Sequence, residues 1–128
     1  MPEPQPSHWL EREDVGDLTV LRVQAPLLRA DDATEGVFDA ACALVDATGR
    51  SRLVLNLERV ALLASAAVGR LVLLMRKAAS AGGKLVLCKA SRPVEGILRL
   101  CHLSDVLPSY ADEQEALRAL SAQGGPAL

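Results

Sequence analysis

Few side chains in this sequence could carry out chemistry, and Ser65 is the most suggestive of them. Its hydroxyl would act as a nucleophile only beside a base, and the histidines of the chain are His8 and His102. A strand-to-helix nucleophile elbow has glycine two residues to each side of its serine, where this chain has Leu63 and Ala67. A serine hydrolase would have to bring His102 to Ser65 through the fold alone. We therefore predict that the chain is not an enzyme.

The cysteines Cys42, Cys88 and Cys101 match neither a disulfide framework nor a zinc motif. Their number is odd, and no Cys-x-x-Cys spacing occurs. Their apolar neighbours predict buried free thiols. Cys101 and His102 are adjacent, and adjacent helical residues point in different directions, which argues against a thiol–imidazole pair. The sequence also lacks a phosphate-binding loop and a dinucleotide fingerprint. We predict no metal and no cofactor.

Two roles fit Ser65 from residue chemistry alone. As a helix N-cap, its hydroxyl would accept a backbone N–H and contribute about 1 kcal/mol. As a phosphoacceptor, it would place a phosphate at the positive end of a helix, where backbone N–H groups favour an anion. A phosphate there would add about two negative charges to a corner lined with alanine, and a partner fitted to that corner would be repelled.

The composition excludes several classes of protein. Half of the 128 residues are hydrophobic and 23% are charged, which is typical of one globular domain. The net charge of -2 and three aromatic residues argue against nucleic-acid binding. No apolar run reaches the roughly 18 residues that span a bilayer, and the N-terminus lacks the features of a signal peptide. We expect a soluble cytoplasmic protein without direct membrane insertion.

Strands and helices alternate along the chain, which predicts an α/β fold with a mostly parallel sheet of four to five strands and helices packed on it. Ser65 lies in the turn between a buried strand and a long helix that ends at Gly82-Gly83. We expect a leader at 1–8, one domain at 9–122 and a tail at 123–128. Strands are expected at 9–15, 18–23, 53–57 and 84–89, and a brief strand or an extended link at 109–110. Helices are expected near 33–48, 65–81, 92–101 and 113–122, and a connection at 27–32.

The helix after Ser65 has a wide apolar stripe. Leu73 and Leu74 extend it beyond what a surface helix needs. Either the helix is buried on two sides, or one of these leucines belongs to a contact surface. The predicted buried positions of this helix are Val68, Leu71, Val72, Met75 and Ala79. Those of the helix near 33–48 are Val37, Phe38, Ala41, Leu44 and Val45, and those of the helix near 92–101 are Val94, Ile97, Leu98 and Cys101.

Four segments between Leu53 and Leu120 resemble the STAS domain of the anti-sigma factor antagonist family, in the same order and without insertion. They are LVLNLERV, ASAAVG, AGGKLVLCKASRPV and LRLCHLSDVLPSYADEQEAL. The resemblance implies a mixed sheet covered by helices and no catalytic activity. It also implies that Ser65 holds the position that a partner kinase, itself an anti-sigma factor, phosphorylates. In that scheme the unphosphorylated protein binds the kinase and frees a sigma factor, and phosphorylation ends the binding.

The chain departs from the family at the turn itself. The typical turn is Asp-Ser-Ser/Thr-Gly-Leu-Gly, and here it is Ala-Ser-Ala-Ala-Val-Gly from Ala64 to Gly69. The family's Gly-x-Leu-Asp run corresponds to Ala-Pro-Leu-Leu at 25–28. Because polar groups are lost, the alternative is a scaffold or transporter-associated subunit that is never phosphorylated. In either case we expect the protein partner to contact Leu28, Arg29, Asp31, Ala64, Ala66, Ala67, Val68, Gly69 and Leu73.

Overall fold

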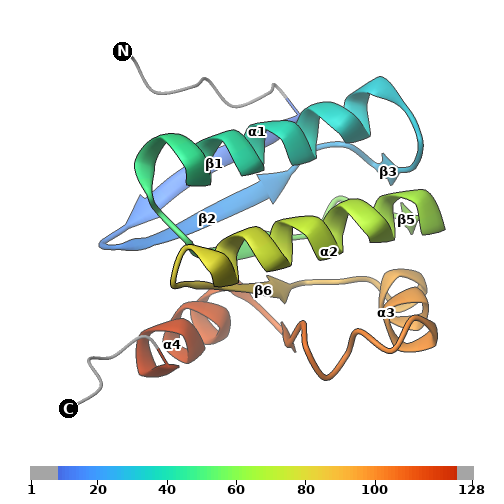
Figure 1. The fold of residues 1–128 in the computed structure, drawn as a ribbon. Helices are drawn as coiled ribbons and strands as arrows, with labels where there is room; N and C mark the ends of the chain where they lie inside the picture. The colour runs from blue at the N-terminus through green and yellow to red at the C-terminus, as the bar shows by residue number, and fades with distance from the viewer. Residues whose placement is uncertain (1–8, 124–128) are drawn as a thin grey trace.

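The structure, a computed structural model, describes residues 9–123 (Figure 1). The expected leader at 1–8 and the expected tail beyond Gln123 lie outside these residues. Five strands form one mixed sheet in the order β1-β2-β4-β6-β7, in which only the β1–β2 pair is antiparallel. The predicted α/β class and strand number are confirmed. The strands are β1 (Leu10–Val15), β2 (Leu18–Val23), β4 (Arg52–Asn56), β6 (Lys84–Cys88) and β7 (Ser109–Tyr110).

Helices connect the parallel strands and cover both faces of the sheet. In Figure 1, α1 and α2 lie side by side over one face, and α4 packs against the opposite face. Along the central strands, Leu53 and Leu55 of β4 face α1 and α2, whereas Val54 between them faces α4. This alternation explains why the middle three residues of both β4 and β6 are apolar. The helices are α1 (Asp32–Thr48), α2 (Ser65–Ser80), α3 (Arg92–Leu100) and α4 (Glu113–Gln123).

The ends of α1 follow from local chemistry. The carboxylate of Asp31 accepts the N–H of Thr34 at 2.9 Å and so caps the first turn. Gly49 follows the last turn with φ 73, a left-handed conformation that costs glycine little. Both ends agree with the sequence prediction, as do all five buried positions expected on this helix.

A second, two-stranded sheet was not predicted. Leu27–Leu28 (β3) pairs in parallel with Leu62–Leu63 (β5), although 27–32 was expected to be a connection only. Each strand has two residues, too short for a periodic pattern to show in the sequence. This small ladder ties the segment before α1 to the segment before α2.

Some expected buried faces were wrong in detail. In α2 the buried positions include Leu74, which has no exposed surface, whereas Leu73 is 56% exposed and Ala79 is exposed. The apolar stripe therefore contains both a core residue and a surface residue. In α3, Val94 and Leu98 are buried, but Cys101 is exposed because the helix ends at Leu100. The prediction of a buried thiol holds for Cys88, while Cys42 is only partly buried.

Candidate functional site

The corner around Ser65 is assembled from two segments that are distant in sequence. The N–H of Ala64 donates to the carbonyl oxygen of Leu28 at 2.8 Å, and the N–H of Ala61 donates to that of Pro26 at 2.7 Å. These bonds extend the β3–β5 ladder on both sides. They hold the loop before α1 against the start of α2, as the adjacent positions of β3 and β5 in Figure 1 illustrate.

Ser65 is the first residue of α2 and not its N-cap, so the capping interpretation is wrong. The cap position is Ala64, with φ −79 and ψ 157, and no side chain caps the helix there. The Ser65 side chain is exposed and has no hydrogen bond to any described residue. Within residues 9–123, the N–H groups of Ser65 and Ala66 also have no acceptor, as expected for the first turn of a helix. The hydroxyl is free to react, beside two unsatisfied donors.

The loop beside this turn carries a charged pair. Arg29 Nε donates to Asp31 Oδ2 at 2.8 Å, and the other carboxylate oxygen of Asp31 caps α1. The Arg29 N–H donates to the Thr34 hydroxyl at 2.8 Å, which fixes the backbone of the loop. Hydrogen bonds from Arg29 and from the Thr34 backbone lower the pKa of Asp31 to about 2. This loop is therefore ordered by its own contacts.

The nine residues expected to meet a partner divide into a surface and its support. Leu28, Ala67 and Val68 are buried and form the apolar base of the corner. Asp31 and Ala64 are partly buried. The exposed members, which a partner could touch, are Arg29, Ala66, Gly69 and Leu73.

Ser65, Gly69 and Leu73 are spaced at i, i+4 and i+8, so they follow one line along the outer side of α2. This line, here called the α2 ridge, spans about 12 Å along the helix axis. A Cβ built on Gly69 would meet no atom within 4 Å, which shows that the middle of the ridge is open.

Leu62 belongs to the same exposed corner and was missed by sequence reasoning. It is 45% exposed, whereas Leu63 beside it is 1% exposed. Neighbouring residues of a strand point to opposite sides, so one leucine enters the core and the other faces outward. The alternation was not detectable in a two-residue strand. With Leu62, the apolar surface extends to the strand side of Ser65.

The hydrolase hypothesis finds no support in the geometry. Among the described residues, no hydrogen bond joins Ser65 to His102, and both side chains are exposed. His102 follows the end of α3 with φ 58, a left-handed conformation set by the turn after the helix. The other histidine of the sequence, His8, lies outside the described residues.

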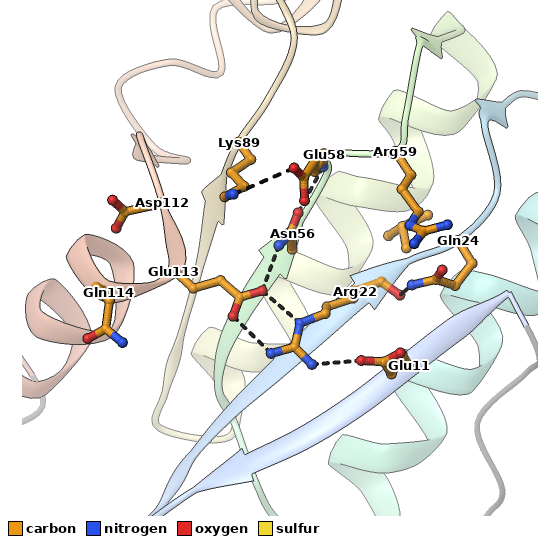
Figure 2. Close-up of a pocket in the computed structure, with 11 residues that line it drawn as sticks. Glu11, Arg22, Gln24, Asn56, Glu58, Arg59, Lys89, Asp112, Glu113 and Gln114 are labelled. Carbon is orange, nitrogen blue, oxygen red and sulfur yellow. Dashed lines mark hydrogen bonds and ion pairs between the residues drawn. The ribbon is translucent and has the colours of Figure 1, made fainter.

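A polar pocket of about 430 Å³ lies elsewhere, at the carboxyl ends of the central strands (Figure 2). Such edges commonly hold ligands in α/β proteins. Here the carboxylate of Glu113 in α4 accepts a hydrogen bond from Arg22 Nε at 2.8 Å and one from the side-chain amide of Asn56 at 2.6 Å. Arg22 also donates to Glu11 at 2.7 Å and to Glu13 at 2.6 Å.

These contacts pair Arg22 with three carboxylates at the base of the pocket. Hydrogen bonds from Arg22, and then from Asn56, lower the pKa of Glu113 against the opposing effect of burial. Hydrogen bonds that Arg22 donates to Glu113, Glu13 and Glu11 raise the pKa of Arg22. No serine, threonine, cysteine or histidine lines this pocket. The network of Arg22, Asn56 and Glu113 therefore fastens α4 to the sheet.

Burial lowers the reactivity of two of the three thiols. Burial raises the pKa of Cys88 to about 12 and also raises the pKa of Cys42, so both favour the protonated form. Across residues 9–123, histidine, cysteine, aspartate and glutamate side chains form no group of three able to hold a metal ion.

Comparison with known proteins identifies the family. The sequence profile of the STAS domain matches residues 10–116, most of the chain, and the chain belongs to the STAS domain family. No curated protein matches the sequence significantly. In the part of the chain that the structure describes, no helix is both long and apolar enough to cross a lipid bilayer.

Solved structures share the fold. An anti-sigma factor antagonist (STAS) domain protein from Planctomyces limnophilus has a TM-score of 0.75 at 24% identity, over 88% of this chain and 97% of that one. SpoIIAA from Bacillus, in its unphosphorylated form, has a TM-score of 0.74 at 21% identity, over 93% and 99%. A sulfate transporter family protein from Wolinella succinogenes has a TM-score of 0.71 at 15% identity, over 88% and 91%.

Proposed function

We propose that this chain is a regulatory protein-binding module whose partner contacts the α2 ridge and Leu62. The observation that carries the proposal is the exposed Ser65 at the uncapped start of α2, followed along the ridge by the open Gly69 and the exposed Leu73. Apolar side chains around one reactive polar group suit a contact that a charge could disrupt. The chain supplies a surface, and no catalytic step is assigned to it.

The partner in this proposal is an anti-sigma factor that is also a serine kinase, acting in the cytoplasm. The kinase holds ATP and transfers its γ-phosphoryl group to Ser65 Oγ. The new bond forms between Oγ and phosphorus, the bond from phosphorus to ADP breaks, and the hydroxyl proton passes to a base of the kinase. The exposure of Ser65 supports this step. So does the existence of a phosphorylated form of SpoIIAA, whose fold this chain shares at a TM-score of 0.67.

Phosphorylation would end the contact through charge and hydration. A phosphate carries about −1.5 to −2 charges at neutral pH and holds water strongly. The side chains of Leu62, Ala66 and Leu73 offer no polar groups to replace that water. A partner surface that fits the apolar ridge would then have to cover a hydrated dianion, which weakens binding.

A second function is favoured by one specific observation. The residues flanking Ser65 are Ala64 and Ala66, so no neighbouring side chain orients the hydroxyl toward a kinase. A scaffold or transporter-associated module would use the same ridge permanently. The fold shared with the sulfate transporter family protein fits this alternative.

The experiment uses the serine kinases encoded near this chain, each incubated with the protein and ATP. Mass spectrometry should detect one phosphate on the wild type and none on Ser65→Ala. Calorimetric titration should show that Ser65→Ala still binds the kinase, whereas Ser65→Glu and Leu73→Asp bind at least tenfold more weakly. Ser104→Glu, at an exposed serine distant in sequence from the ridge, serves as the charge control. Binding without phosphorylation would favour the scaffold, and equal binding by all variants would remove the ridge as the contact.

A further inference from the structure

Arg29 and Ser65 each lie one residue beyond a hydrogen bond that joins their two segments. The β3–β5 register pairs Leu28 with Leu63, and the Ala64 N–H donates to the carbonyl oxygen of Leu28 at 2.8 Å. Arg29 follows Leu28 and Ser65 follows Ala64, so the two residues start from neighbouring backbone positions. Both residues are exposed, and the long arginine side chain can turn toward a group attached to Ser65.

The guanidinium of Arg29 is held only at the surface. It is 57% exposed and pairs with Asp31, which is 32% exposed. Exposed ion pairs of this kind contribute little to stability and exchange partners readily. Asp31 keeps a second contact, the Thr34 N–H at the start of α1, so it can lose Arg29 without losing its capping role.

Two cations of α2, Arg70 and Lys77, are engaged with α1. Arg70 contacts both Glu35 and Asp39, and Lys77 donates to Asp46 at 2.8 Å. These pairs bridge the two helices along the side of α2 that faces α1. Arg29 differs from them because its partner lies two residues away in the same loop, so its release would separate no elements of the fold.

We propose that Arg29 is the cation within this chain that binds the phosphate on Ser65. To bind the phosphate, Arg29 breaks its ion pair with Asp31. This inference rests on Ser65 being the phosphoacceptor of the proposed function. A phosphate dianion attracts the guanidinium more strongly than a single carboxylate and accepts two parallel hydrogen bonds from it. Phosphorylation then rearranges the loop 28–31 and also adds charge to the α2 ridge. Both parts of the surface that a partner contacts therefore change in the same step.

A double-mutant cycle tests the pairing without any partner or kinase. Ser65→Glu places a carboxylate at the start of α2, and it should raise Tm in the wild-type background. In the Arg29→Ala background that increase should fall to half or less, because only the helix dipole remains. Arg76→Ala is the matched control, since this exposed arginine of α2 has no partner among the described residues. It should leave the increase unchanged.

Nuclear magnetic resonance provides an independent measurement on the same proteins. In Ser65→Glu, the Arg29 Nε–H signal should shift, and the pKa of Asp31 should rise from about 2 because it loses its donor. Equal Tm increases in the Arg29→Ala and Arg76→Ala backgrounds, with an unmoved Arg29 signal, would overturn the proposal. That result would leave partner binding untouched, since the kinase and calorimetry experiments measure it separately.

Discussion

Arg22 of β2 and Glu113 of α4 meet through two hydrogen bonds, at 2.8 Å and 2.9 Å, although 91 positions separate them in the sequence. Asn56 of β4 donates to the same carboxylate. This three-way contact joins the first half of the sheet to the last helix, and it lies on the face opposite the α2 ridge. The contact holds α4 on the sheet through polar groups, and no residue of the α2 ridge takes part in it.

Replacing Glu113 should therefore lower the free energy of unfolding without changing the surface of the α2 ridge. Glu113→Ala leaves Arg22 and the 5% exposed Asn56 without their shared acceptor, and we expect a loss of about 1–3 kcal/mol in the free energy of unfolding. Urea unfolding followed by circular dichroism measures it. Gln114→Ala, next in sequence and exposed, should change stability by less than about 0.5 kcal/mol. A null effect of Glu113→Ala would mean that α4 docks through its apolar face alone.

Leu73 and Leu74 should differ sharply in stability. Leu74→Ala removes a fully buried side chain between α2 and the sheet, at a cost of about 2–5 kcal/mol. Leu73→Ala shortens a side chain that is 56% exposed, and should stay within about 0.5 kcal/mol of wild type. Chemical denaturation of both variants tests this. Comparable losses would place Leu73 in the core and withdraw it from the ridge.

Alanine substitutions at Gly83 and Gly69 should have opposite effects on stability. A Cβ at Gly83 would lie 2.1 Å from the backbone oxygen of Ser51, so Gly83→Ala forces the backbone of β6 away from that segment and should lower Tm markedly. Gly69→Ala meets open space inside a helix and should add about 0.5–1 kcal/mol. Thermal unfolding measures both. The stabilised Gly69→Ala protein then tests whether a partner needs close approach to the ridge, because lost binding could not be blamed on unfolding.

Ala64 leaves α2 without a side-chain cap, and Ala64→Asp should supply one. An aspartate there can accept an N–H from the first turn, worth about 0.5–2 kcal/mol, and its charge is favourable at the helix start. Differential scanning calorimetry should show a higher Tm for Ala64→Asp. The matched change Ala66→Asp, at the second residue of α2, should raise Tm by less. It adds a charge near the helix start but cannot adopt the capping geometry. No increase from Ala64→Asp would show that the cap geometry is blocked.

Acid should remove the stabilising contribution of Asp31. Its folded pKa is about 2, below the ordinary 3.8, so the contribution is complete above about pH 4 and is lost as the pH falls toward 2. Asp31→Asn keeps a capping oxygen but not the charge. The Tm difference between wild type and Asp31→Asn should therefore be largest near neutral pH and shrink through this window. Asp32→Asn, in the same turn, controls for the loss of a carboxylate, and a pH-independent difference for Asp31→Asn would contradict the assignment.

The fold could be predicted because the central strands and helices are long enough to show their periods. The run from Leu53 to Leu57 is apolar except for Asn56, which marks a covered parallel strand, and the ends of α1 carry a cap and a glycine. The paired strands at Leu27 and Leu62 could not be found, because two residues show no period.

The sequence predicted the turn between a strand and a helix at Ser65, but not the details of that turn. A shift of one residue moved Ser65 from the cap to the first helical position, and backbone angles at Ala64, not residue types, decide between the two. Leu73 and Leu74 were both apolar and adjacent, so only the packing of α2 could separate them. The Arg22–Glu113 contact had no local signal at all, since its partners come from opposite ends of the chain.

The edges of the sheet determine which surfaces remain available for assembly. On one side, β1 is a strand of alternating charge in which Arg12 pairs with Asp14, and Glu11 and Glu13 are exposed. On the other side, β7 has only two residues. Charged or very short edge strands resist pairing with a strand from another molecule, which protects against aggregation. At high concentration the domain should therefore resist fibril formation, and a partner should bind away from these two edges.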